Sequence, residues 1–136
     1  AYVASTNEAT PEGAGEDGYA LLTASAICAT TSSTTIISTA FTASSVPTTS
    51  RIVVFEENVD TPTLNTDIVA SISRDGGSNF TTATLTDSGY VTGSSGQRIL
   101  TGQAAISGQP SGQSMRWKLA LANNTVKIHG VSLQWS

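Results

Sequence analysis

From Arg51 onward the chain is a succession of short segments with the character of β-strands. Each segment is rich in β-branched residues or alternates apolar with polar residues, and Gly, Pro, Asn, Asp or Ser bounds it. Strands of this kind must bury their inward rows against a second sheet or around a barrel. The pattern predicts an all-β domain, a single β-sandwich of jelly-roll type. Its strands are expected in RIVVFEE, DIVASISRDGG, NFTTATLTD, QRILTGQAAI, MRWKLALA and TVKIHGVSLQW.

Turn residues indicate how the middle strands pair. Apolar residues occupy every second position from Ile68 to Ile72, which is the period of a half-buried strand. Arg74 follows, and we expect it to face solvent or a polar partner. Two glycines in residues 75–77 accept the positive φ that a tight turn demands, so the sequence predicts a hairpin with residues 80–86 returning antiparallel.

The last segment changes register near its middle. After a turn at residues 123–124, apolar residues occupy even positions up to Ile128 and odd positions from there to Trp135. The change at His129 and Gly130 predicts a β-bulge, where one extra residue enters a strand. We expect this final strand to be central in the sheet or well covered, with the ring of Trp135 packed in the core.

The beginning of the chain differs from the rest in composition. Its first 18 residues contain four acidic residues and three glycines, but only two sizeable apolar residues. Such a segment cannot fold on its own. We expect residues 1–20 to form an extended N-terminal arm in which Tyr2, Val3 and Tyr19 contact neighbouring subunits; a frayed terminus is the alternative.

The sandwich domain is then expected to span residues 21–136. Residues 20–29 favour a strand over a short helix, because Thr, Ser and Ile recur there, and residues 34–43 predict a second strand before a proline-containing loop. Cys28 is the only cysteine, so the chain can form neither an intramolecular disulfide nor a thiolate metal site, and we expect a small buried residue. We interpret the chain, from Ala1, as a whole small gene product.

The chain is weakly charged and rich in hydroxyl groups. Charged residues make up 12% of its 136 residues, whereas Ser and Thr together make up about 30%. The formal net charge is -4 and the isoelectric point is near 4.6. This balance lacks the cationic field that nucleic-acid phosphates or anionic lipids require. We therefore expect no nucleic acid and no membrane as partners, and no apolar run approaches the roughly 20 residues of a membrane span.

Few residues could carry catalytic or metal chemistry. His129 is the only histidine, and no nucleophile motif such as G-x-S-x-G lies beside it, so we expect it to be structural, bonded to the backbone or to a neighbouring Asp. Four carboxylates within a dozen residues could supply a glycosidase pair or a calcium site, but they match no EF-hand spacing, and a solvated strand end and loop is favoured. We predict no catalytic residue, no cofactor and no metal. The four carboxylates are Glu56, Glu57, Asp60 and Asp67.

Glycine-rich loops offer the remaining candidate for binding. TGSSGQ and SGQPSGQS fit loops at the ends of a sandwich, where binding surfaces usually lie. Tyr90, with Gln97, Gln109 and Gln113 around it, could form a sugar-binding platform of one aromatic ring and several amides. Loops of ordinary polarity are the favoured interpretation, because aromatic residues are only 6% of the chain.

Four short motifs in residues 35–136 resemble a module found in structural proteins of tailed bacteriophages, often marine ones. The motifs are LNTD at 64–67, SRDGG at 73–77, SGQP at 107–110 and IHG at 128–130. In those phages the module is similar to C-terminal regions of tail or virion proteins, some of which also carry lectin-like jelly-roll domains. The resemblance implies residence in a virion, and it brings no catalytic residue with it.

The sequence as a whole leads us to expect a phage virion structural protein, made in the bacterial host cytoplasm and located on the particle surface. A capsid decoration or cement protein is favoured, with the major capsid protein or tail proteins as partners. Binding would come from many copies that each bury a modest surface, and a homo-oligomer, by family analogy a trimer, is expected. The alternative is a tail or head fibre component that binds host glycans as a carbohydrate or receptor-binding module.

Overall fold

The computed structural model describes residues 33–123 and 125–136, and the chain divides between Ser32 and Ser33. Several expectations from the sequence therefore lie outside the described residues: the N-terminal arm with Tyr2, Val3 and Tyr19, the strand at 20–29 and the burial of Cys28.

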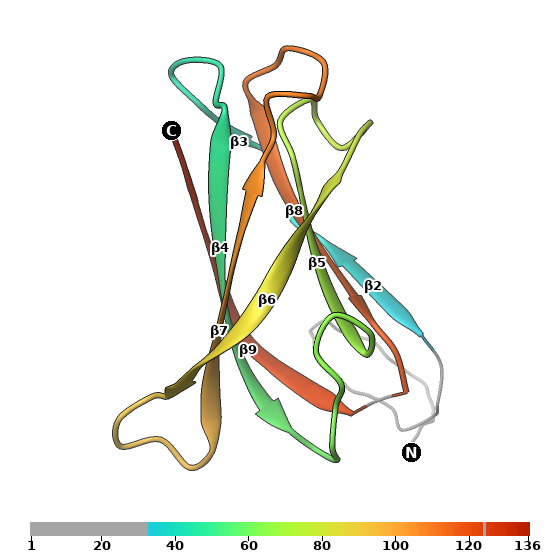
Figure 1. The fold of residues 1–136 in the computed structure, drawn as a ribbon, viewed down its shortest axis with the longest axis vertical. Coiled ribbons are helices and arrows are strands. Elements are labelled where there is room, and N and C mark those ends of the chain that lie inside the picture. Colours follow the sequence, from blue (N-terminus) through green and yellow to red (C-terminus); the bar gives the residue numbers. More distant parts are fainter. Residues whose placement is uncertain (1–32, 124) are drawn as a thin grey trace, which may run out of the picture. The chain divides into compact units, whose positions relative to one another are not determined.

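The described residues form an all-β structure without a helix, as the sequence predicted (Figure 1). The strands are antiparallel and lie in one curled, half-barrel sheet, in the order β2-β8-β5-β6-β7-β4-β9, with β3 also paired to β8. Their bounds are β2 (Thr34–Ile37), β3 (Phe41–Thr42), β4 (Thr49–Asn58), β5 (Ile68–Ser73), β6 (Thr81–Tyr90), β7 (Gln97–Ala105), β8 (Ser114–Leu121) and β9 (Val126–Trp135).

β6 makes the sheet curl because it pairs with different neighbours along its length. Its first residues, up to Ala83, pair with β5, whereas the residues from Thr84 onward pair with β7. The strand therefore belongs to both sides of the curl, and the inner faces of the two sides enclose the core. The largest fully buried hydrophobic side chains on the strands are Ile52, Ile68, Ile72, Leu85, Leu100, Met115 and Leu119.

Two local predictions from the sequence, a hairpin and a β-bulge, are confirmed. β5 and β6 pair antiparallel, and Gly76 and Gly77 in the loop between them have φ of 78° and 97°. In β9, Gly130 pairs with Phe55 while Ile128 pairs with Glu56, so His129 is the extra residue of a β-bulge.

Two other predictions are wrong within the described residues. Residues 34–43 form two short strands instead of one, because the chain leaves the ladder at Ser38, whose side-chain oxygen accepts the backbone N–H of Trp117. β9 lies at the end of the sheet and not in its centre, because it pairs with β4 alone. Trp135 is consequently half-buried, and its ring packs at 6.4 Å from that of Phe41.

Candidate functional site

One end of the curled sheet is held together by a buried arginine. Arg74, at the start of the β5–β6 loop, is 6% exposed, and its guanidinium donates to backbone carbonyl oxygens of two other loops, β3–β4 and β7–β8, at the top of Figure 1. The prediction of a polar partner is thereby confirmed, although the partners are neutral carbonyls. Pro47 and Gln109 are buried, so their carbonyls need a donor from the protein, and the guanidinium that supplies it fixes the loops relative to one another. The acceptors are the oxygens of Pro47, Ser107, Gln109 and Pro110.

Gln109, one of the residues considered for sugar binding, is part of the same hydrogen-bond network. Its side-chain oxygen accepts the backbone N–H of Arg74 at 2.8 Å, and its amide nitrogen donates to Ile72 O and Thr81 Oγ1, each at 2.8 Å. The side chain is 8% exposed, so it is not available to a ligand. Its role is to close the core beneath the loops.

The four residues of the expected sugar platform do not form one surface, which corrects that expectation. Gln109 and Gln113 belong to the β7–β8 loop, and Gln113 donates to Ala43 O at 3.2 Å. Tyr90 ends β6 and Gln97 begins β7, which places both at the opposite end of the sheet (Figure 1). The two pairs lie at opposite ends of β7, which is nine residues long. The polar loops of the sequence did not indicate that a whole strand separates them.

The opposite end of the sheet holds a buried ion pair. Glu56 is 0% exposed, and its Oε2 accepts Arg98 Nε at 2.5 Å. Arg98 also donates to Asp87 Oδ2 and to Asn58 Oδ1, each at 3.1 Å. Burial opposes the charge of Arg98, but the hydrogen bond and charge of Glu56 and then those of Asp87 outweigh it and raise the pKa of Arg98. Glu56 Oε1 has no hydrogen-bond partner, so Arg98 alone compensates that carboxylate.

The alternation of β4 could have revealed the burial of Glu56 but not its partner. Ile52, Val54 and Glu56 share the inward face, since they lie two residues apart in one strand. Arg98 is the register partner of Glu56 on β7, 42 residues away. Nothing in a single sequence indicates that register.

The remaining acidic residues point in different directions and do not converge. Asp60 accepts the backbone N–H of Thr61 at 2.9 Å, and Asp67 accepts that of Thr63 at 2.8 Å. Asp67 also accepts the amide of Asn123 at 3.0 Å, which fastens the loop after β8. These carboxylates serve as turn caps. Among the described residues no group of His, Cys, Asp or Glu is arranged to hold a metal ion.

His129 and Glu57 meet on the outer face of β4 and β9. His129 Nε2 lies 3.2 Å from Glu57 Oε1, and Lys127 Nζ lies 3.5 Å from the same oxygen. The hydrogen bond with His129 and the charge of Lys127 lower the pKa of Glu57. The histidine therefore has a glutamate as its partner, where we expected the backbone or an aspartate.

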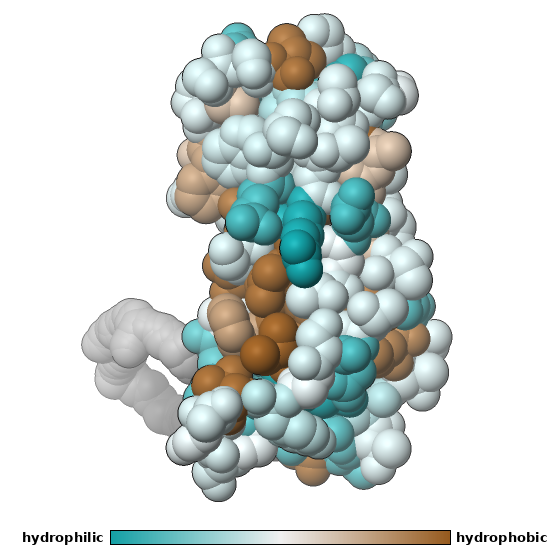
Figure 2. All heavy atoms as spheres, turned by 60° about the vertical axis from the view of Figure 1, so that its left-hand side comes forward, coloured by the Kyte–Doolittle hydropathy of each residue, from teal (hydrophilic) through white to brown (hydrophobic). Residues whose placement is uncertain are grey.

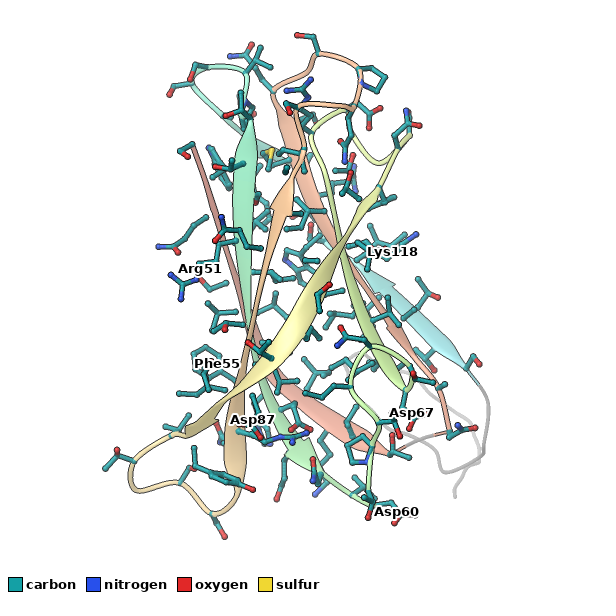
Figure 3. The ribbon with its side chains drawn as sticks, viewed as in Figure 1. Arg51, Phe55, Asp60, Asp67, Asp87 and Lys118 are labelled. Carbon is teal, nitrogen blue, oxygen red and sulfur yellow. The ribbon has the colours of Figure 1, made fainter. Side chains whose placement is uncertain are left out.

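An arginine also lies on this outer face, with polar neighbours on both sides. Arg51 of β4 is the register partner of Gln103 on β7 and of Gln134 on β9, so the three side chains form a row across the sheet. All three are exposed. Figure 3 shows that Arg51 points away from the interior. We call these three residues the Arg51 row.

Directly along the same face lies a group of apolar side chains. Val53, Phe55 and Ile99 are half-buried at outward positions of β4 and β7, where Phe55 and Ile99 are register partners. The ring of Phe55 also lies over Gly130, where an added Cβ would stand 3.6 Å from the ring. Figure 2 shows this side of the molecule, with a hydrophobic area below a band of hydrophilic side chains.

A shallow groove of about 240 Å³ runs beside the Arg51 row. Besides the row, Trp135 and the hydroxyls of Thr49 and Ser136 line it. The two hydroxyls lie 2.9 Å apart and are bonded to each other. This groove could not be predicted from the sequence, because its residues come from three strands, and the end of the chain, that are neighbours only in the folded sheet.

Comparisons with protein-family models, with curated proteins and with solved structures find no match for the chain. The described residues contain no helix with the length and apolar character that a membrane crossing needs.

Proposed function

We propose that the chain is a structural protein of a tailed-bacteriophage virion and that it decorates the capsid surface as a cement protein. In this proposal the curled sheet is a β-sandwich of jelly-roll type, and residues 1–20 are an arm that reaches a neighbouring subunit. The phage-like motifs of the sequence support the location. The protein acts by binding and not by catalysis.

Open strand edges at both ends of the sheet carry the proposal. Within the described part of the chain β2 pairs only with β8, and β9 only with β4, so each has one side without a strand partner. Ile37 on β2 is 50% exposed and Phe41 on β3 is 40% exposed. An open edge beside exposed apolar side chains can add a strand of another chain, with backbone hydrogen bonds for affinity.

Assembly through such surfaces fits a protein present in many copies. Each contact with the major capsid protein or a tail protein would be modest, and the sum over linked copies would give retention. We propose a homo-oligomer, with a trimer as the favoured state. Mass measurement by light scattering at high protein concentration tests this, and a monomer there would contradict it.

The experiment that tests the location is binding of the purified chain to capsids and to tails from which it has been stripped. A variant without residues 1–18 serves as the comparison, with circular dichroism to show that its sheet is intact. Saturable binding to capsids that is lost with the arm supports decoration. No binding to either particle contradicts the proposal.

A matched pair of full-length variants tests the role of the open edge. Ile37→Lys places a charge beside the edge of β2, where charge blocks strand addition. Val59→Lys is the control, because Val59 is 54% exposed but lies beyond the end of β4. We expect the first to weaken capsid binding and the second to leave it unchanged; equal effects would remove the edge from the mechanism.

The second candidate function is a tail or head fibre component that binds host carbohydrate. The groove beside Arg51 favours it, because its lining includes an arginine, two glutamines and Trp135. Binding only to tails or to host glycans, unaffected by the arm, would decide for this function.

A further inference from the structure

We infer that the groove beside the Arg51 row binds a sugar unit that carries a carboxylate, such as a uronic acid in an acidic polysaccharide. This inference names the ligand class for the second candidate function and rests on that function. It does not depend on where the protein sits in a virion.

Arg51 differs from the other arginines in having no side-chain partner among residues 33–123 and 125–136. Arg74, Arg98 and Arg116 all donate to carbonyl or carboxylate oxygens. Within the part of the chain that the structure describes, Arg51 forms no ion pair, and its guanidinium makes no hydrogen bond. Its planar donor fork is therefore free to bind a carboxylate through two parallel hydrogen bonds.

The neighbours of Arg51 present groups that suit sugar hydroxyls. Gln103 and Gln134 flank it on adjacent strands, and neither side-chain amide has a partner within the described residues. Each amide offers two donors and an acceptor, which matches hydroxyl groups that both donate and accept. A ligand carboxylate on Arg51 would place ring hydroxyls within reach of both amides, because register partners stand about 5 Å apart.

Apolar side chains lie beyond the row on the same face, outside the lining of the groove, where a sugar unit next to the bound one would reach. Val53 lies two residues from Arg51 on the same face, and Phe55 follows two residues later, with its ring exposed in part. The carbon-bound hydrogens of a sugar ring can pack on such a surface, as apolar groups do in most ligand sites. The groove volume of about 240 Å³ suits one small unit and not a drug-sized ligand.

The number of charges and the hydroxyl groups distinguish this ligand from other anionic ligands. A nucleic acid requires several cations along its backbone, whereas Arg51 is the one cation among the described residues that line the groove, in a chain of net charge -4. An acidic peptide would supply a carboxylate but not the array of hydroxyls that two flanking amides match. A carboxylated sugar uses all three members of the row.

The test is a titration of the full chain, labelled with ¹⁵N, with the trimer of galacturonic acid, the neutral trimer of galactose and triglutamate. We expect the acidic sugar to bind and to shift the backbone amides of Arg51, Gln103 and Gln134. Arg51→Gln should weaken this binding at least about tenfold, since a hydrogen-bonded charge is lost. Lys127→Gln removes the same charge from the same face, at an exposed site, and should leave binding unchanged.

Three results would each overturn the inference. They are binding of the neutral trimer as tight as that of the acidic one, binding of triglutamate as tight as that of the acidic sugar, and amide shifts that lie away from the Arg51 row. Failure of all three probes would also overturn it. Capsid binding is measured separately, so the decoration proposal stands or falls without this result.

Discussion

Each end of the curled sheet holds a largely buried arginine side chain, and the two arginines stabilise the sheet through different kinds of acceptor. At one end Arg74 donates to neutral backbone carbonyls of two loops, β3–β4 and β7–β8. At the other end Arg98 donates to the carboxylates of Glu56 and Asp87. The first arrangement holds loop backbones together, and the second holds three strands, β4, β6 and β7, together through charge.

This difference determines what happens when either arginine is removed. Without Arg74, several carbonyls lose a donor, and those that the loops can turn toward water recover one. Without Arg98, the fully buried carboxylate of Glu56 loses the only side-chain partner it has in the described part of the chain and cannot reach water without opening the strands. The charged end should therefore be the more sensitive of the two.

The largest effect is expected from Arg98→Met. It should lower the free energy of unfolding by about 3 to 5 kcal/mol, because it leaves a buried charge uncompensated. Urea unfolding measures this. The double variant Glu56→Leu with Arg98→Met should recover at least half of the loss, since replacing a buried pair by apolar groups is often neutral. If the double variant is as unstable as the single one, the charge of Glu56 is not the cause.

A smaller loss is expected from Arg74→Met. We expect about 2 to 4 kcal/mol, because several buried carbonyls lose their donor while the loops can partly rehydrate. Arg51→Met is the matched control and should change stability by no more than about 0.5 kcal/mol, since Arg51 is exposed. A loss for Arg74→Met that exceeds the loss for Arg98→Met would reverse the comparison between the two ends.

The smallest effect concerns pH and the turn that follows Arg74. The side-chain hydrogen bond from Asn79 (2.6 Å), followed by bonds from its backbone and from Ser73, lowers the pKa of Asp75 to about 2. Since the folded pKa lies below the ordinary value near 3.9, this stabilisation is present above about pH 4 and is lost as the pH falls through 2. We expect Asp75→Asn to cost about 1 kcal/mol at pH 7, after allowance for solvent screening.

Urea unfolding of both proteins between pH 7 and pH 2 measures this term. The stability difference between them should shrink as the pH falls below about 4, because Asp75 itself becomes protonated. A difference that stays constant over this range would mean that the carboxylate charge contributes nothing.

Local patterns predicted the strands well, and the contacts between distant strands could not be predicted in the same way. Alternation placed β5 and β8 within a residue or two of their true bounds, and the register change at His129 revealed the bulge. These features depend on neighbours in the sequence. The position of β9 at the end of the sheet depends on which strands pair, which the local pattern does not encode.

The candidate site shows the same limit more strongly. Tyr90 and Gln109 both lie in polar, glycine-rich surroundings, yet they fold to opposite ends of the sheet. The Arg51 row joins β4 to partners about 50 and 80 residues further along the chain. Each member looks like an ordinary exposed residue of its own strand, and only the register brings the three together.

The division of β6 between two neighbours has a consequence for how this unit opens. Because one part of β6 is bonded to β5 and the other to β7, neither side of the curl can detach while this strand remains in place. Partial opening would break the ladder on one side and strain it on the other. Amide protons on both sides should therefore exchange with solvent through the same cooperative event, and the described unit should respond to denaturant as one body instead of two.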